Sequence, residues 1–544
     1  MAIFLNPDNA NFNEAVHSKI YVDKTGLIEY TNSVLSTTAK FVCNSRPRRF
    51  GKSMTADMLC AYYSKGCDSR ELFQPYMVSS CSTFEKYINQ YDVIHIDVQW
   101  CKDQVENIND IVNYIKGSCM HELQNEYSNI DYNGIISLSG TLSKINDETG
   151  HRFVVIIDEW DVLIRDNANN KKLLEEYIDF LKGLFKESQP SRYIALAYLT
   201  GILPIKRTMT QSALNNFDEY TMLNPGPLAS FIGFTEGEVK VLSNKYNIDF
   251  ERIKKWYDGF VFGKITDIYN PWSILNFLDK GKIDTYWANT SSNGLVSKLV
   301  REGDADLKSV FEELLKGKNI LCPIDEQIVY NQLDDDSEAV WSLLLASGYL
   351  KVVSIEKKVV GKRQLYELSL TNMEVLDMFY DMVRGWFKKS AGNYNAFVKA
   401  LLINDVEAMN EYMNVISEEI FSNFDVGTKP SKLQPERFYH GFVLGLLVDL
   451  AEDYIVTSNR ESGFGRYDVM IEPKDRSKEA FILEFKVYNP RKEDSLEETV
   501  ENALIQIEEK QYETNLSAKG IPIDNIKKYG FAFKGKKVLI GCRG

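Results

Sequence analysis

Residues 40–60 read KFVCNSRPRRFGKSMTADMLC, and this segment decides the fold of the N-terminal half. A short apolar run is followed by a turn and then by Gly51, Lys52 and Ser53 at the start of a helical pattern. This is the strand, loop and helix context that a phosphate-binding P-loop requires. In such a loop backbone N–H groups hold phosphate oxygens, the lysine neutralises the terminal phosphates, and the hydroxyl ligates magnesium. Arg46 stands where the GxxxxGK[ST] pattern has its first glycine.

A second apolar run ends in two carboxylates. Residues 151–159 read HRFVVIIDE, which is typical of a buried parallel strand. In P-loop ATPases the first acid after such a strand holds magnesium through water, and the second orients or deprotonates the attacking water. We therefore expect these roles for Asp158 and Glu159. A strand end with two solvated acids is the alternative interpretation.

Two further apolar runs, residues 93–98 and 193–201, predict neighbouring strands. Together with helices between them they predict a parallel sheet, whose ligands bind at the carboxyl ends of the strands. Thr200 lies where a polar sensor of the γ-phosphate could stand, although a Thr-Gly pair at a strand end is also common in ordinary turns.

Length and composition limit the class of protein. A chain of 544 residues exceeds what one core organises, so we expect two to four domains. The N-terminus lacks the regions of a signal peptide, and no run of about 18 apolar residues occurs. The eight cysteines form no CxxC pair, so neither a disulfide framework nor a zinc site is indicated. We expect a cytoplasmic protein with no membrane-spanning segment.

The charge is unevenly placed. A formal net charge of −14 argues against unselective coating of nucleic acid. Residues 519–543 nevertheless hold seven Lys or Arg against one acid, an excess that a nucleic-acid backbone could use. A solvated basic surface explains this segment equally well.

The C-terminal part contains a second chemical pattern. Residues 463–487 read GFGRYDVMIEPKDRSKEAFILEFKV and predict a two-stranded hairpin. Period-two geometry puts Glu484 and Lys486 on one face of the second strand, and the hairpin brings Asp468 beside Glu484. Two carboxylates beside a lysine can hold Mg²⁺ or Mn²⁺ while the lysine orients or activates water for attack on phosphate. A surface ladder of alternating charges also produces this pattern.

The middle of the chain is less informative. Residues 343–370 predict a helix that leads into two strands through a polar turn, the order seen in a winged helix. Such a module either reads DNA or connects domains, and we favour the connector because the segment is not basic. Apolar spacing from residue 374 to 412 predicts helices with aromatic side chains in their core.

The N-terminal motifs together resemble the AAA-ATPase-like family, whose members commonly carry a C-terminal PD-(D/E)XK nuclease domain. In that family the loop reads RPRRFGKS, so Arg46 and Arg49 belong to its own form of the motif. The resemblance covers most of residues 15–290 and implies an ATP-binding domain with a helical lid. The ordered segments that carry it are YVDKTG (21–26), RPRRFGKS (46–53), IDEWD (157–161), LTG (199–201), LNN (214–216), GFT (233–235), WYDGF (256–260) and YNPW (269–272).

Residues 435–544 resemble the PD-(D/E)XK domain found at the end of these proteins, with Tyr467 in place of the proline before Asp468. The resemblance implies that Asp468 and Glu484 are metal ligands and that Lys486 is catalytic. Glu436, on a helix before the strands, and Gln506, on a helix after them, are implied as further members. His440 is either functional or a neutral histidine packed in its helix, and we favour the packed histidine.

The predicted fold class is α/β: a parallel-sheet P-loop ATPase core (1–217), a helical lid (218–290), a winged-helix-like linker (291–375), a helical connector (376–434) and a nuclease-fold domain (435–544). The expected function is ATP-regulated, metal-dependent cleavage of nucleic acid, with DNA the favoured substrate. ATP and Mg²⁺ are the expected cofactors, with Mn²⁺ as an alternative at the nuclease site, and assembly into a homo-oligomer is compatible with the sequence. The main alternative is an ATP-switched regulator whose nuclease fold binds nucleic acid or protein without cutting. A motor without nuclease activity is a weaker alternative, because no helicase-type motif set is present.

Overall fold

The computed structural model describes residues 2–186, 190–204, 214–287, 294–303, 305–326, 339–357, 359, 361, 363–420, 434–462 and 465–543. The chain divides into two compact units. The first comprises Met1–Ser291 and Leu321–Val375, and the second comprises Ser292–Ile320 and Leu376–Gly544. The predicted middle segment, 291–375, therefore contributes to both units.

Within the described residues, the main sheet of the first unit has five strands in the order β2-β3-β4-β1-β5. All of its pairings are parallel, which confirms the parallel sheet expected from the apolar runs. Its central strands β3 and β4 are buried along their whole length because helices cover both faces. The strands are β1 (Phe41–Ser45), β2 (Asp92–Asp97), β3 (Phe153–Asp158), β4 (Ile194–Gly201) and β5 (Asp218–Tyr220).

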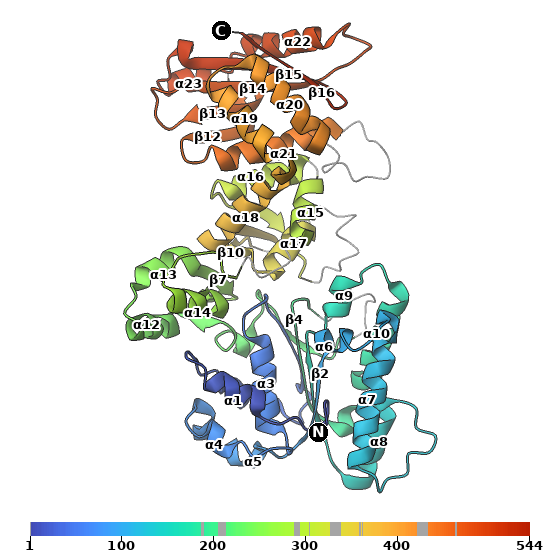
Figure 1. The fold of residues 1–544 in the computed structure, drawn as a ribbon. Helices are drawn as coiled ribbons and strands as arrows, with labels where there is room; N and C mark the ends of the chain where they lie inside the picture. Colours follow the sequence, from blue (N-terminus) through green and yellow to red (C-terminus); the bar gives the residue numbers. More distant parts are fainter. Residues whose placement is uncertain are drawn as a thin grey trace. The chain divides into compact units, whose positions relative to one another are not determined.

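Helices α1 and α3 lie on one side of this sheet, and α7, α8 and α10 lie on the other (Figure 1). The second group packs on the sheet through a large apolar core. Parallel strands need such crossover connections, so their carboxyl ends all meet at one edge of the sheet. The helices of this core are α1 (Ala10–Val16), α2 (Gly26–Val34), α3 (Lys52–Tyr63), α4 (Arg70–Phe73), α5 (Phe84–Tyr87), α6 (Val98–Lys102), α7 (Ile111–Glu126), α8 (Leu138–Thr149), α9 (Val162–Asp166), α10 (Lys171–Phe185) and α11 (Pro190–Tyr193).

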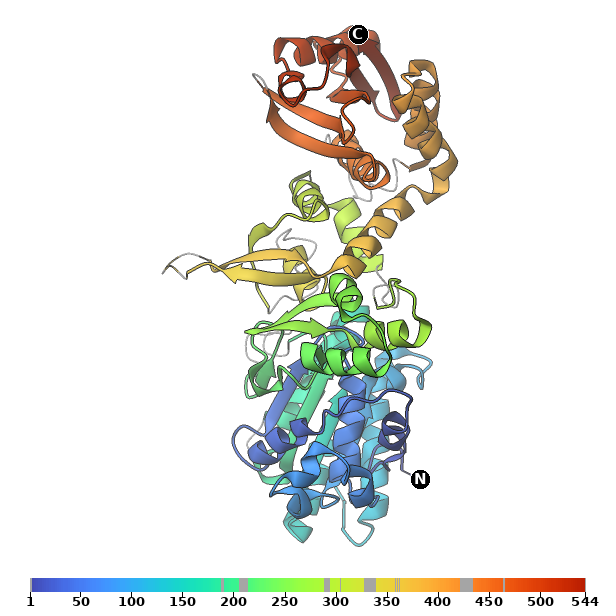
Figure 2. The ribbon, with the colours of Figure 1, turned by 90° about the vertical axis from the view of Figure 1, so that its left-hand side faces the viewer.

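The lid combines helices with a small antiparallel sheet, whereas the sequence predicted only helices. Its strands β6 (Phe234–Thr235), β7 (Asp258–Phe262) and β8 (Ile265–Tyr269) pair in the order β6-β8-β7. They lie beside the lid helices, shown in green in Figure 2. The helices are α12 (Glu236–Lys245), which begins with a capping box, α13 (Phe250–Tyr257), and α14 (Pro271–Lys280), which begins with an Asn cap followed by proline.

The middle segment follows the predicted order of a helix and two strands. Helix α17 (Ala339–Ala346) leads into β10 (Leu350–Ile355), which pairs antiparallel with β11 (Leu365–Leu370). Strand β9 (Ile320–Pro323) completes this sheet in the order β10-β11-β9.

The second unit is built around a mixed sheet in the order β12-β13-β14-β15-β16. Strands β14 and β15 are parallel, and helix α22 provides the crossover between them. The strands are β12 (Tyr454–Ser462), β13 (Gly465–Pro473), β14 (Ala480–Val487), β15 (Ile526–Lys534) and β16 (Lys537–Arg543). The helices are α15 (Gly294–Glu302), α16 (Ala305–Leu315), α18 (Met373–Trp386), which begins in the first unit, α19 (Ala391–Leu402), α20 (Val406–Ile420), α21 (Gln434–Asp449), α22 (Leu496–Glu509) and α23 (Thr514–Ala518).

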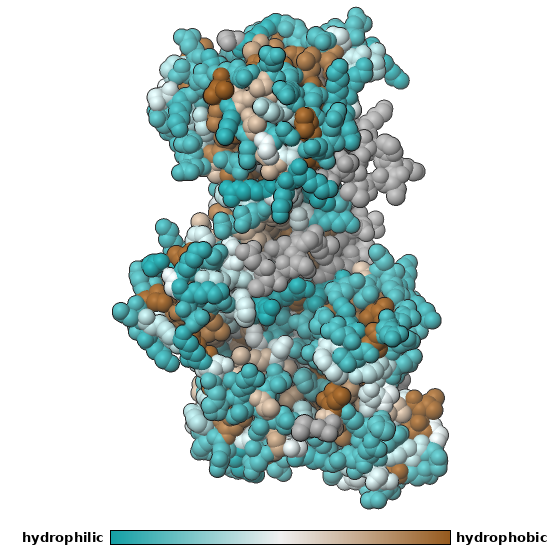
Figure 3. Space-filling view, in the orientation of Figure 1, coloured by the Kyte–Doolittle hydropathy of each residue, from teal (hydrophilic) through white to brown (hydrophobic). Residues whose placement is uncertain are grey.

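The surface is mostly hydrophilic in both units on the face shown in Figure 3, with apolar residues scattered in small groups. Among the described residues, no helix is both long enough and apolar enough to cross a membrane.

Candidate functional site

The P-loop follows β1 at the carboxyl edge of the main sheet. Gly51 caps α3 with a φ of 88°, a left-handed conformation that glycine adopts without strain. Lys52 is buried, and its Nζ donates to the carbonyl of Pro47 at 3.1 Å. Ser53 is exposed on the first turn of α3, and its role as a magnesium ligand stays a prediction.

The two predicted loop arginines connect the P-loop to the lid. Arg46 is fully buried, and its Nη1 donates to the carbonyls of Ser45 and Tyr220, each at 2.8 Å. Its guanidinium lies 4.8 Å from the ring centre of Phe262 in β7, and burial lowers its pKa to about 10. Arg49 is exposed and lies 4.7 Å from the ring centre of Trp272 in α14. Their role in nucleotide binding stays a prediction.

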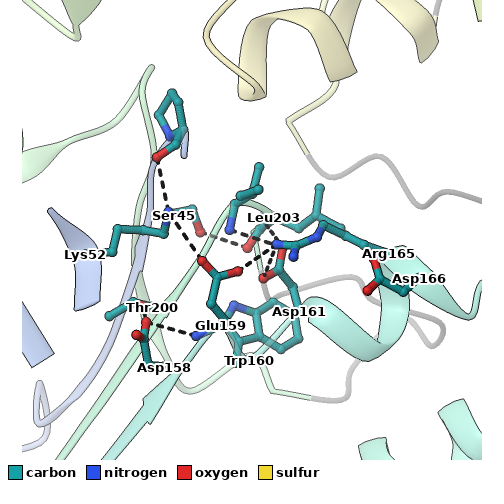
Figure 4. Close-up of polar contacts among 12 residues, drawn as sticks. Ser45, Lys52, Asp158, Glu159, Trp160, Asp161, Arg165, Asp166, Thr200 and Leu203 are labelled. Atoms are coloured by element: carbon teal, nitrogen blue, oxygen red, sulfur yellow. Dashed lines mark hydrogen bonds and ion pairs between the residues drawn. The ribbon is translucent and has the colours of Figure 1, made fainter. Parts of the chain in front are cut away.

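Asp158 and Thr200 meet because β3 and β4 are neighbours in the sheet. Both are buried, and the hydroxyl of Thr200 donates to Oδ1 of Asp158 (Figure 4). The same oxygen accepts the backbone N–H of Glu159 at 3.0 Å. Glu159 itself has a φ of 51°, which turns the chain sharply after the strand.

Glu159 lies between two cations (Figure 4). Its Oε1 is 3.8 Å from Nζ of Lys52, and its Oε2 accepts from Nη1 of Arg165 at 2.9 Å. Burial alone raises the pKa of Glu159, but the charges of Lys52 and Arg165 outweigh it and lower the pKa below its usual range. The carboxylate is therefore held ionised beside the P-loop lysine.

Sequence reasoning missed the roles of Asp161 and Arg165. Asp161 is fully buried and accepts the backbone N–H groups of Ile202 and Leu203 at 3.1 and 2.9 Å. Burial raises its pKa, and Arg165, 3.2 Å away, opposes that rise. The signal was the third acid of the IDEWD segment, Asp161, with a basic residue four positions later, a spacing that places both on one helical face.

A cavity opens beside Gly51 between the P-loop helix, the N-terminal segment and the lid. It holds about 550 Å³ of empty space, part of it open to solvent. Lys24 in its wall is fixed by Glu238 at 2.7 Å and by the carbonyl of Ser230 at 2.9 Å. The rest of the wall is largely apolar and aromatic, which suits a flat heterocycle: Phe12, Ile20, Tyr21, Val22, Phe50, Met54, Met58, Phe231, Phe234 and Leu275.

The second unit brings together three of the predicted nuclease residues. Glu484 on β14 is buried, and the side-chain amide of Gln506 on α22 donates to its Oε1. Lys486, two residues further along β14, donates from Nζ to Oε1 of Gln506 at 2.7 Å. The amide of Gln506 also lies 3.2 Å from the hydroxyl of Tyr512. Gln506 therefore fixes the orientation of both predicted groups.

For the other predicted nuclease residues, the structure describes the backbone but not the side chains. Val469 pairs with Leu483, so the register puts the preceding Asp468 opposite Glu484 on the same face of the sheet. The side chain of Asp468 lies outside the described residues, as do those of Glu436 and His440 on α21. Among the side chains that are described, no three His, Cys, Asp or Glu residues form a metal cluster.

Four of the seven basic residues in segment 519–543 form ion pairs with neighbouring acids. Its ion pairs join Lys519 to Glu472 (2.5 Å), Lys527 to Glu479 (3.6 Å), Lys528 to Glu513 (3.2 Å) and Arg543 to Glu508 (2.8 Å). These pairs reduce the positive potential that the sequence indicated for this segment.

Comparisons with known proteins give a family match at each end of the chain. Residues 10–210 match a family described as "Predicted AAA-ATPase", and residues 434–542 match one described as "PD-(D/E)XK nuclease superfamily". The chain is also similar to an "Uncharacterized protein in vnfD 5'region" of Azotobacter chroococcum mcd 1, with 24% identity over 366 residues. That alignment covers 65% of this chain and 64% of the relative, so it spans less than two thirds of the relative's length.

One solved structure, "Structure of the Aeropyrum Pernix ORC2 protein (ADPNP-ADP complexes)", aligns over 70% of this chain and 99% of that chain. The sequence identity is 13% and the TM-score is 0.28.

Proposed function

We propose that the chain hydrolyses ATP and cleaves nucleic acid, with DNA as the favoured substrate. This proposal rests on its AAA-ATPase-like domain and its domain of the PD-(D/E)XK nuclease superfamily. The observation that carries the ATPase part is the meeting of Lys52, Glu159, Asp158 and Thr200 at one edge of the main sheet. A phosphate-neutralising lysine, a magnesium-holding acid and an ionised water-orienting acid are what phosphoryl transfer needs in one place.

The residues at this edge fit ATP and Mg²⁺. Gly51 and Lys52 would hold the phosphates, while Ser53 and Asp158 would hold the magnesium ion. Glu159 would orient the attacking water, and Thr200 would sense the γ-phosphate. The apolar cavity beside Gly51 would receive the base, with Phe50 and Phe234 among its aromatic walls.

The nuclease part rests on the contacts of Glu484, Gln506 and Lys486. Asp468 and Glu484 offer carboxylate oxygens, the ligands that Mg²⁺ and Mn²⁺ prefer. The metal ion, when bound, would supply Lewis-acid activation of the phosphodiester. Lys486 would orient or activate water, and Gln506 would hold Glu484 and Lys486 in position. Glu436 is proposed as an additional acid near the metal.

Calorimetry with ATP and Mg²⁺ tests the first activity. Wild-type protein should bind ATP, and Lys52→Ala should not, because the buried ammonium that faces the phosphates is gone. Lys65→Ala is the control and should bind normally. It removes a lysine that lies outside the P-loop and whose Nζ is 2.7 Å from Oδ1 of Asp92. Equal affinity in wild type and Lys52→Ala would refute the assignment.

The second activity is tested by incubating the protein with labelled DNA and RNA, with Mg²⁺, Mn²⁺ or EDTA, and with or without ATP. We expect cutting of DNA only when a divalent ion is present. Tight binding of nucleic acid without any cutting would instead support an ATP-switched regulator whose nuclease fold is not catalytic.

A further inference from the structure

Helix α18 is shared by the two units. Its residues up to Val375 belong to the first unit, and those from Leu376 onward belong to the second. The helix contains no proline or kink-forming pair at this boundary, so its backbone runs from one unit into the other without a sequence signal for a break.

The start of α18 is fixed to the lid by buried contacts. Glu374 is fully buried, and its carboxylate accepts the hydroxyl of Ser273 in α14 and the backbone N–H of Trp287 at 2.6 Å. Asn372 caps the helix by accepting the N–H of Val375, and its amide donates to the carbonyl of Tyr257 at 3.1 Å.

Two lid residues, Trp287 and Asn270, contact the P-loop. The indole N–H of Trp287 donates to the carbonyl of Arg48 at 2.9 Å, and the amide of Asn270 lies 3.4 Å from the same carbonyl. Trp287 thus contacts the loop through its indole N–H, and it contacts Glu374 through its backbone N–H. Only one residue separates the P-loop from the first turn of α18 along this route.

A second route runs through the middle segment. Gly348 packs so closely on the P-loop that a Cβ at this position would lie 2.8 Å from Cγ of Pro47. Its carbonyl accepts the hydroxyl of Thr371 at 2.7 Å, just before α18 begins. The two routes reach the helix from neighbouring residues of the loop, Pro47 and Arg48.

Nucleotide binding would change this part of the loop. The ammonium of Lys52 donates to the carbonyl of Pro47, and a bound phosphate would compete for that ammonium. The freed carbonyl must find another donor or move, because an unpaired buried carbonyl is costly. Arg48, the next residue, would carry the change to Trp287.

We infer that Trp287 and Glu374 form a relay through which occupancy of the P-loop biases helix α18 and, along it, the nuclease unit. This relay rests on the proposed ATP function of the P-loop, and it names the residues that would couple the two activities. Coupling between sites requires an element whose equilibrium both sites bias, and the relay assigns that part to the first turn of α18.

Hydrogen exchange of the full chain, with and without Mg²⁺ and a non-hydrolysable ATP analogue, tests the relay. In the wild type the analogue should change amide exchange in residues 376–386 by about fivefold or more, the lower end of typical allosteric coupling. Trp287→Phe keeps an aromatic ring but removes the N–H bonded to the carbonyl of Arg48, so it should still bind the analogue and show a smaller change, because only the route through Trp287 is interrupted. Trp256→Phe is the matched control, because the indole N–H of this lid tryptophan has no acceptor among the described residues.

Glu374→Gln keeps the shape of the side chain and should also reduce the analogue-induced change in amide exchange of residues 376–386. This variant replaces Trp287→Phe in the experiment if Trp287→Phe does not fold. If the wild type binds the analogue without any change in residues 376–386, or if both variants keep the full change, the relay is refuted and ATP binding stands. Failure of the wild type to bind the analogue would refute the ATP function and the relay together.

Discussion

Glu159 contacts Lys52 and Arg165 at the same time, so its carboxylate is ionised and its position is fixed. We predict that Glu159→Gln binds ATP but hydrolyses it about 10²- to 10⁴-fold more slowly, because an uncharged amide cannot orient or deprotonate water as a carboxylate does. Calorimetry measures the binding, and steady-state phosphate release measures the turnover.

Glu148→Gln is a suitable control for this variant. Glu148 is an exposed acid on α8 that pairs with Lys144 at 2.7 Å. Unchanged ATP hydrolysis in Glu159→Gln would show that a group other than Glu159 orients the water.

Lys486 donates to Gln506, the side chain that also donates to Glu484, so the lysine is held beside the proposed metal ligand. We predict that Lys486→Ala retains Mn²⁺ binding and loses about 10²-fold or more of the cutting rate. Glu484→Gln should lose both, since it removes a ligand oxygen. Calorimetry with Mn²⁺ and a cleavage assay on labelled DNA separate the two variants, and Lys510→Ala, directly after the end of α22, is the control. Full cutting by Lys486→Ala would contradict its catalytic role.

At the scale of elements, strand β7 approaches the chain before α18 so closely that only glycine fits. Gly259 has a φ of 137°, and a Cβ there would lie 1.9 Å from the carbonyl oxygen of Thr371. We predict that Gly259→Ala destabilises the protein by about 3 kcal/mol or more, the upper end of overpacking effects. Urea or thermal unfolding followed by circular dichroism measures this loss.

Gly281 provides the matched control, because it also has a positive φ, 67°, but nothing lies within 4 Å of its Cβ position. Gly281→Ala should cost only about 1–2 kcal/mol, the penalty of the left-handed conformation itself. Equal losses in the two variants would show that the close contact at Gly259 contributes nothing.

For the whole molecule, charge determines how nucleic acid can bind. The net charge is −14, and four of the seven basic residues in segment 519–543 are paired with acids, which weakens the attraction of this segment for phosphates. We predict that DNA affinity, measured by fluorescence anisotropy with non-cleaving Ca²⁺, weakens about tenfold or more in EDTA, a difference of about 1.4 kcal/mol. The carboxylate of Glu484 repels phosphate when no metal is bound.

Two variants sharpen this experiment. Glu484→Gln should bind DNA more tightly than the wild type in EDTA, because the repulsion is removed. Lys528→Ala should change affinity little, since this lysine is already paired with Glu513. Tight binding that does not depend on a divalent ion would contradict the prediction.

The sequence by itself determined the elements whose signals are local. The apolar strand before Gly51-Lys52-Ser53, the acid-ended run at Asp158 and the alternation around Glu484 and Lys486 each depend on a few consecutive residues. Backbone propensity and side-chain period decide such features before any long-range contact forms. The parallel sheet and the nuclease-type domain followed from them.

Only the tertiary structure decided which distant groups meet. Gln506 between Glu484 and Lys486, and Trp287 between the P-loop and Glu374, are contacts between residues that lie far apart in the sequence. The strands of the lid were also missed, because short strands pair through partners that no local pattern specifies. Burial then sets the charge state of these groups, since desolvation and neighbouring charges act through space and not along the sequence.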